Sequence, residues 1–144
     1  MASSILLSFL RDMLSAYQPT AAMPKMVVAT PANHWHELGA LIAAIIAAES
    51  GWHAYYFGPN LPAEEIAAAA GYKAAAAVAL SVVYHDADRQ ALREIKRLRH
   101  YLTDDVAIII GGNGVRSYQS ELKQINVLHP LNFSEFRDTL DRLT

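Results

Sequence analysis

Residues 26–48 read MVVATPANHWHELGALIAAIIAA, and this stretch decides the fold. Its first five residues, 26–30, form a β-branched run that predicts a buried strand. Its last part, 40–48, is almost wholly apolar and suits a helix packed against a sheet. A short loop with His34 and His36 lies between them. A side chain able to bind a ligand thus follows the carboxyl end of a buried strand, where open α/β sheets bind their ligands.

The same alternation of strand and helix continues along the chain. Five parallel strands with helices between them predict a sheet covered on both faces. The runs at 76–81 and 106–110 are continuously apolar, as strands buried in a parallel sheet are. The predicted fold is α/β, a flavodoxin-like or Rossmann-like three-layer α/β/α sandwich with a five-stranded parallel sheet and an extra N-terminal helix. Strands are predicted at 25–30, 53–57, 76–81, 106–111 and 125–128, and helices at 3–17, 35–50, 62–70, 87–102, 116–123 and 133–143.

Turn and capping residues support these boundaries. Gly51 follows the predicted helix 35–50 as a C-cap, and Pro62 fits the start of the next helix. Asp86 is a plausible N-cap for the helix at 87–102. Asn132 or Ser134 can cap the last helix in the same way.

Composition indicates one folded domain. The chain has 144 residues, of which 53% are hydrophobic and 18% charged, so it can bury a full core. Residues 1–24 form the extra helix and a linker, and residues 25–144 form the domain. The amphipathic face of the extra helix is expected to pack on the domain or on a second chain as a homo-oligomer.

Cysteine and charge exclude several classes of function. The chain has no cysteine, which excludes disulfides, thiol catalysis and thiolate metal sites and favours the cytoplasm. A net charge of −2 does not indicate direct nucleic-acid binding by this segment, because such domains usually carry an excess of positive charge. The basic residues at 89–99 alternate with acidic ones and are interpreted as a solvated helix face. No apolar run is long enough for a membrane span.

The residues at the carboxyl edge of the predicted sheet favour binding over catalysis. Glycines there let a ligand approach the backbone closely, and Ser81 can donate and accept hydrogen bonds. No base is positioned for a serine nucleophile, and a phosphate loop with lysine is absent. The edge set consists of His36, Gly58-Pro59-Asn60, Ser81-Val82-Val83-Tyr84, Gly111-Gly112-Asn113-Gly114 and His129.

This edge set resembles the cobalamin-binding domain family over residues 25–144. The family carries Asp-x-His-x-x-Gly, then Ser-x-Leu or Ser-x-Val, then Gly-Gly, in this order on these loops. The matching residues are His36 and Gly39, Ser81 and Val83, and Gly111 and Gly112. The segments His-Glu-Leu-Gly and Gly-Pro-Asn-Leu-Pro are similar to segments of the cobalamin domains of light-responsive MerR-type transcription regulators.

The resemblance implies a binding mode as well as a cofactor. The cofactor's own dimethylbenzimidazole base leaves cobalt, and His36 replaces it as the lower axial ligand. The displaced nucleotide tail enters a slot between the sheet and the helices. The cofactor is adenosylcobalamin, methylcobalamin or hydroxocobalamin, and haem is the alternative. The implied contacts besides His36 are Gly39, Ser81, Val83, Gly111 and Gly112, with Asn60, Tyr84, Trp35 and Asn113 as further candidates.

One residue departs from the family's pattern. The family's Asp, two residues before the ligand, is His34 here. That Asp hydrogen-bonds the ligand histidine and raises its basicity. Its replacement implies weaker or more pH-sensitive axial ligation than in the mutases and methyltransferases of the family.

Three functions follow from the resemblance. The first is a non-catalytic cobalamin-binding module with a sensory or regulatory role in transcription, such as a photoreceptor that acts with a DNA-binding domain or regulator protein. The second is the corrinoid carrier subunit of a cobalamin-dependent mutase or methyltransferase. The third is a haem-binding sensor domain of the same fold.

Overall fold

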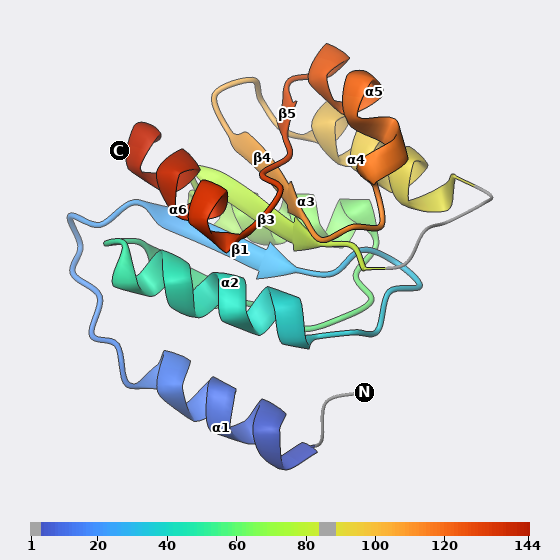
Figure 1. Ribbon diagram of the computed structural model, residues 1–144. Helices are drawn as coiled ribbons and strands as arrows, with labels where there is room; N and C mark the ends of the chain where they lie inside the picture. The colour runs from blue at the N-terminus through green and yellow to red at the C-terminus, as the bar shows by residue number, and fades with distance from the viewer. Residues whose placement is uncertain (1–3, 84–88) are drawn as a thin grey trace.

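A sheet of five parallel strands forms the centre of the molecule (Figure 1). The computed structural model describes residues 4–83 and 89–144. The strand order is β2-β1-β3-β4-β5, the order of flavodoxin-like folds, so the predicted fold class is confirmed. The strands are β1 (Lys25–Ala29), β2 (His53–Tyr56), β3 (Ala77–Ser81), β4 (Ala107–Gly111) and β5 (Val127–Leu128).

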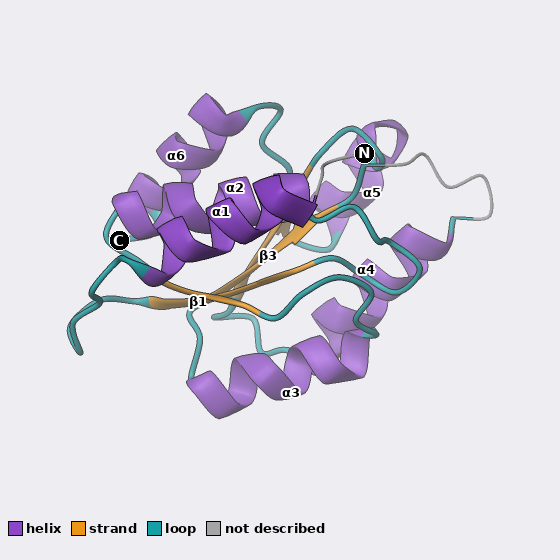
Figure 2. Cartoon of the chain, turned by 90° about the horizontal axis from the view of Figure 1, so that it is seen from below, coloured by secondary structure: helices purple, strands orange, loops and turns teal. Residues whose placement is uncertain are grey.

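Helices cover both faces of this sheet (Figures 1 and 2). One face carries α2 and α6, and the opposite face carries α3, α4 and α5. The first helix, α1, lies outside α2 as an additional layer. The helices are α1 (Ser4–Ser15), α2 (Leu38–Glu49), α3 (Ala63–Lys73), α4 (Gln90–Tyr101), α5 (Gln119–Gln124) and α6 (Phe133–Arg142), and a single 3₁₀ turn, η1 (Arg116–Tyr118), precedes α5.

Alternation along the strands divides the core into two clusters. Successive side chains of a strand point to opposite faces of the sheet. Val27 and its strand neighbour Val78 therefore pack with α3 and α4. Met26 and Val28, which flank Val27, pack with α2 and α6 instead. The central strands are buried on both faces, which explains why their sequence is continuously apolar.

Several predicted boundaries were wrong. The helix predicted at 35–50 begins only at Leu38, because Trp35 and His36 belong to the loop after β1. The helix predicted at 62–70 continues to Lys73, since Gly71 is accommodated inside it and a left-handed Ala74 ends it. The strand predicted at 125–128 keeps only two residues that pair with β4.

The capping residues mostly lie as expected. Gly51 adopts a φ of +90° directly after Ser50, the C-cap of α2, as a glycine that ends a helix does. Pro62 is the N-cap of α3. Asn132, rather than Ser134, caps α6 by accepting a hydrogen bond from the backbone N–H of Glu135 at 2.8 Å. The predicted cap at Asp86 falls outside the described residues.

The helix α1 packs on the outer side of α2. None of its residues is buried, and it contacts α2 through partly exposed side chains such as Leu14. Within 4–83 and 89–144, no helix has both the length and the apolar character needed to cross a bilayer.

Candidate functional site

The candidate site lies where the strand order reverses, since the chain adds β2 on one side of β1 and then β3 on the other. In the sheet, β1 lies between β2 and β3. The loops that leave the carboxyl ends of β1 and β3 therefore diverge and leave a crevice, which is the usual ligand site of this fold class. The loop after β1 carries His36, and β3 ends at Ser81.

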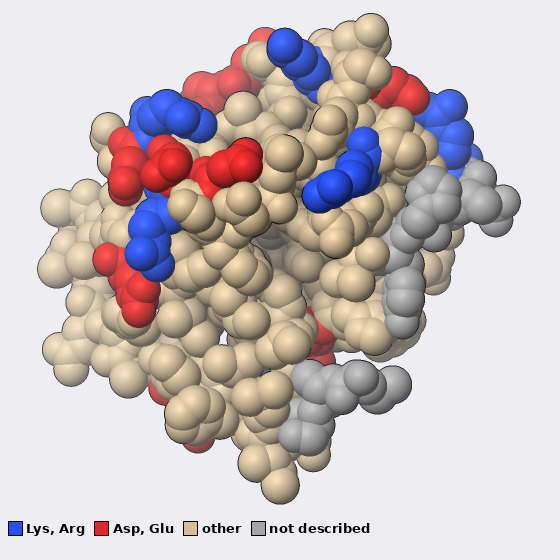
Figure 3. All heavy atoms as spheres, viewed as in Figure 1, with Lys and Arg blue, Asp and Glu red and all other residues tan. Residues whose placement is uncertain are grey.

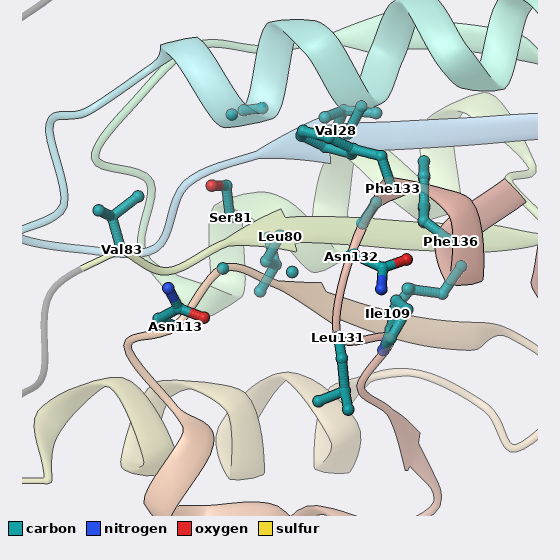
Figure 4. Close-up of a pocket in the computed structure, with 17 residues that line it drawn as sticks. Val28, Leu80, Ser81, Val83, Ile109, Asn113, Leu131, Asn132, Phe133 and Phe136 are labelled. Atoms are coloured by element: carbon teal, nitrogen blue, oxygen red, sulfur yellow. The ribbon is translucent and has the colours of Figure 1, made fainter.

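A cavity of about 340 Å³ opens at this crevice (Figure 4). Its walls are α2, the strands β1, β3 and β4, and the start of α6. Its lining residues are mostly apolar and all uncharged. Figure 3 shows a hollow surrounded by uncharged residues on this face, with charged side chains gathered mainly toward its upper part. The size and lining suit a small organic group with few polar atoms.

The structure brings six of the predicted site residues together in this cavity. They come from three separate segments of the chain, the start of α2, the end of β3 and the turn after β4. In Figure 4, Ser81, Val83 and Asn113 lie toward one end of the cavity, and Phe136 lies toward the other. The six residues are Gly39, Ser81, Val83, Gly111, Gly112 and Asn113.

Close packing of α2 on β3 depends on Gly39. A β-carbon at this position would lie 2.8 Å from the hydroxyl oxygen of Ser81. The absence of a side chain lets the first turn of α2 approach the end of β3, and both residues line the cavity. Ser81 is 8% exposed, and its hydroxyl has no hydrogen-bond partner among the described residues. This hydroxyl is therefore available to a ligand in the cavity.

The turn after β4 depends on Gly112 in a different way. Gly112 has a φ of +90°, and a β-carbon there would come within 2.3 Å of the carbonyl oxygen of Val82. That oxygen accepts a hydrogen bond from the N–H of Gly114 at 2.8 Å, so the backbone of the two loops is joined directly. Gly111, by contrast, has room around it, with its nearest neighbour atom 4.0 Å from a β-carbon.

The loop that carries His36 is fixed by Thr30, a buried residue that sequence reasoning missed. The Thr30 hydroxyl donates to the carbonyl oxygen of His34 and accepts from the N–H of Asn60 at 2.8 Å. The side-chain oxygen of Asn60 accepts from the N–H of Asn33 at 2.7 Å. Asn60 therefore holds the histidine loop against the loop after β2 and does not line the cavity.

The two histidines and the tryptophan of this loop differ in burial. His34 is 8% exposed, whereas His36 is partly buried and Trp35 is 65% exposed. His36 and Trp35 do not line the cavity and lie on the loop that precedes α2. The described residues contain no cluster of three or more histidine, aspartate, glutamate or cysteine side chains able to hold a metal ion. A single imidazole such as His36 suits a metal whose other ligands come from a cofactor.

Glu37, at the N-cap position of α2, contacts two other elements of the structure. Its Oε1 accepts hydrogen bonds from the guanidinium of Arg11 and from the hydroxyl of Tyr56, both at 2.6 Å. Burial, together with the hydrogen bond to Glu37, raises the pKa of Tyr56 far above its usual value. The Tyr56 hydroxyl therefore remains a donor to this carboxylate at any physiological pH.

The other predicted edge residues that the structure describes do not line the cavity. One ring nitrogen of His129 lies 3.2 Å from the carbonyl oxygen of Gly112, and the other lies 3.4 Å from the side-chain amide of Gln119. His129 thus supports the glycine turn from outside. Tyr84 lies outside the described residues.

The wall of the cavity formed by the start of α6 was not predicted from the sequence. Asn132 was predicted only as a cap, and the segment around it carries aromatic residues that close the cavity from the side of α6. A pattern of small residues at Gly39, Ala40 and Ala43 on one side of α2 was the available sign that something packs there. The missed lining residues are Val28, Ala40, Ala43, Ala79, Leu80, Ile109, Pro130, Leu131, Asn132, Phe133 and Phe136.

Comparison with known proteins agrees with this geometry. Residues 24–142 match the model of the B12 binding domain family. No curated protein matches the chain.

Solved structures share the fold at low sequence identity. A cobalamin-binding protein of Desulfitobacterium hafniense DCB-2 is 20% identical with a TM-score of 0.71, over 85% of this chain and 60% of that one. The monomethylamine corrinoid protein of Methanosarcina barkeri is 15% identical with a TM-score of 0.68, over 97% and 64%. A pilus assembly-related protein of Burkholderia pseudomallei K96243 is 14% identical with a TM-score of 0.62, over 88% and 92%. The chain spans less than two thirds of the first two proteins.

Proposed function

The chain belongs to the B12-binding domain family, and on that premise we propose that it is a cobalamin-binding module that holds the cofactor with its own base detached from cobalt. In this proposal His36 is the lower axial ligand, and the nucleotide tail occupies the cavity beside it. The observation that carries the proposal is the mostly apolar cavity of about 340 Å³ between α2, β3 and β4, which both Gly39 and Ser81 line.

The residues of the cavity fit a detached heterocyclic base. A flat, mostly apolar ring system suits walls formed by Val28, Ala79 and Ile109. The Ser81 hydroxyl lines the cavity and can donate a hydrogen bond to, or accept one from, a polar atom of the tail. Gly39 keeps the entrance free of side-chain atoms. When bound, an alkylcobalamin would supply a cobalt–carbon bond that light can cleave, or an alkyl group that can be transferred to a partner.

Axial ligation by His36 can be tested directly. Protein labelled with ¹⁵N-histidine and loaded with cob(II)alamin should show a doublet splitting in its EPR spectrum, where unlabelled protein shows a triplet. A base that stays on cobalt gives the triplet in both samples. His36→Ala should lose the isotope effect, whereas His100→Ala, which changes an exposed histidine on α4, should keep it. A triplet in the labelled wild-type protein would refute the ligand assignment.

Occupation of the cavity by the tail needs a separate test. Ser81→Leu fills the slot and should lower cobalamin affinity by at least about tenfold, as overpacking a close-fitting site does. Cobinamide, which lacks the nucleotide tail, should bind the wild type and this variant equally well. Equal cobalamin affinity in both proteins would contradict a buried tail. Equal cobinamide affinity also shows that the variant is folded.

We further propose a sensory or regulatory role for the module. The cavity is lined by uncharged residues with one hydroxyl, and its described walls present no general base or acid. The adenosylcobalamin form should then change its oligomeric state or its absorbance spectrum on illumination, measured by size-exclusion chromatography and spectroscopy in darkness and in light. Methyl transfer to or from a separate enzyme, without a response to light, would instead identify a corrinoid carrier subunit. A Soret band after reconstitution with haem, and no uptake of corrinoids, would identify a haem sensor.

A further inference from the structure

We propose that Glu37 is a positioning residue that couples α1 to the histidine loop, so that docking of α1 and binding of a corrinoid at His36 favour each other. The inference rests on the proposed function in taking His36 as the axial ligand. It adds a regulatory input that reaches the site from the outermost layer of the molecule (Figure 2).

The contacts of Glu37 connect three elements at one oxygen atom. Arg11 from α1 and Tyr56 from β2 both donate to its Oε1 at 2.6 Å. The side chain of Glu37 is only 14% exposed, whereas that of Arg11 is 47% exposed. Glu37 stands at the N-cap position of α2 but makes no side-chain capping bond. Its carboxylate therefore serves contacts between elements and not the end of its own helix.

The position of Glu37 in the chain makes these contacts relevant to the site. It follows His36 directly, and its carbonyl oxygen accepts the N–H of Leu41 at 2.9 Å, the first rung of α2. The other side of the loop is held by Thr30 and its hydrogen bonds. A shift of the Glu37 backbone must therefore be taken up in the short segment between these two attachments, which includes His36.

The helix α1 packs on the domain without burying any of its own twelve residues. An isolated helix of this length is marginal in water, so its order depends on what it packs against. Solvent and salt screen an ion pair with one mostly buried partner less than they screen a fully exposed pair. Loss of the Arg11–Glu37 contact should therefore loosen α1 and free the histidine loop on that side.

Coupling of this kind is reciprocal. If docked α1 raises corrinoid affinity by some factor, bound corrinoid must favour docking of α1 by the same factor. A partner that pulls α1 away would weaken cofactor binding, and cofactor binding would order α1.

The test combines cobalamin affinity with hydrogen exchange of α1. Arg11→Gln should lower cobalamin affinity by about fivefold, the lower end of common coupling factors, and Arg11→Lys should restore part of it. In the wild type, cobalamin should slow amide exchange across α1, and in Arg11→Gln it should not. The control is Arg137→Gln, which removes an exposed contact at 3.4 Å with Glu49 at the other end of α2. This control should behave as the wild type in both measurements.

A second variant separates coupling from a purely structural role. Glu37→Gln keeps an acceptor oxygen for the Tyr56 hydroxyl but loses the charge that pairs with Arg11. It should therefore reproduce the effect of Arg11→Gln, and the double variant should be no worse than either single one, because both remove the same ion pair. Unchanged affinity in Arg11→Gln, or α1 exchange that ignores cobalamin in the wild type, would overturn the proposal.

Failure of the proposed function would look different. If the wild type takes up no corrinoid, the coupling between α1 and the histidine loop is measured in the cofactor-free protein. The measurements are amide exchange of α1 and the NMR chemical shifts of the His36 ring. Changes in both in Arg11→Gln, but not in Arg137→Gln, would support the coupling. Wild-type values in Arg11→Gln would refute it.

Discussion

The hydroxyl oxygen of Ser81 lies only 2.8 Å from the point where a β-carbon on Gly39 would stand. The two residues are far apart in the chain and belong to α2 and β3. Their close approach sets the width of the cavity entrance, so substitutions at either residue should separate effects on binding from effects on folding.

Gly39→Ala should leave stability nearly unchanged but impair binding. Alanine gains up to about 1 kcal/mol of helix propensity over glycine, which offsets the contact with a hydroxyl that can rotate away. Rotation of the Ser81 hydroxyl and the added methyl group both narrow the slot, so cobalamin affinity should fall about tenfold. Urea unfolding and a cobalamin titration measure the two effects.

The double variant Gly39→Ala/Ser81→Ala is the control for this contact. It removes the oxygen atom that meets the new methyl group, so its stability should equal or exceed that of the wild type. A single variant Gly39→Ala with wild-type cobalamin affinity would show that the slot entrance does not limit binding.

Gly112→Ala should destabilise the protein more than Gly51→Ala. Both glycines have a φ of +90°, so both substitutions strain the backbone by about 1–3 kcal/mol. Only at Gly112 would the methyl group also meet a backbone oxygen, that of Val82, at 2.3 Å, whereas nothing lies within 4 Å at Gly51. Urea midpoints of the two variants measure the difference. Equal midpoints would mean that the glycine turn shifts without cost.

Asn132→Ala should lower stability by about 1 kcal/mol through the loss of an N-cap. The side chain of Asn132 accepts the N–H of Glu135 at 2.8 Å at the start of α6. Because Asn132 and Phe133 also line the cavity, cobalamin affinity should fall as well. Asn132→Asp keeps an acceptor oxygen and should retain stability, as measured by thermal unfolding. A destabilised Asn132→Asp would assign the effect to something other than the cap.

His53 should make stability depend on pH. Burial, and then the positive charges of Lys25 and Lys73, lower the pKa of His53 below its ordinary value of 6.5. The unfolded chain then binds a proton at this residue more readily than the folded chain does. Its contribution to stability is present above about pH 6.5 and is lost as the pH falls toward the lowered pKa.

His53→Gln tests this dependence. Between about pH 7.5 and about pH 5 the variant should lose less stability than the wild type, measured by urea unfolding at each pH. Parallel loss of stability in the two proteins would show that another group causes the acid sensitivity.

Local patterns predicted the elements of this fold more reliably than their ends. Continuous apolar runs identified β3 and β4 because both faces of these strands are buried. The predicted start of α2 was wrong because nothing in the sequence near Trp35 and His36 shows that Thr30 bonds the carbonyl oxygen of His34, just before them, into a loop.

The alternation of strands and helices could be predicted from the sequence alone, and so could the location of the three motifs at the carboxyl edge of the sheet. Both predictions rest on apolar periodicity and motif order, which are properties of residues that are neighbours in the chain. Folding brings Gly39, Ser81 and Gly112 together with the start of α6 around one cavity. It also places Arg11 where its guanidinium donates a hydrogen bond to Glu37. Neither arrangement could be predicted from the sequence. These relationships depend on how segments distant in the chain pack together, and their few ångströms of separation are set by the whole core and not by any local pattern.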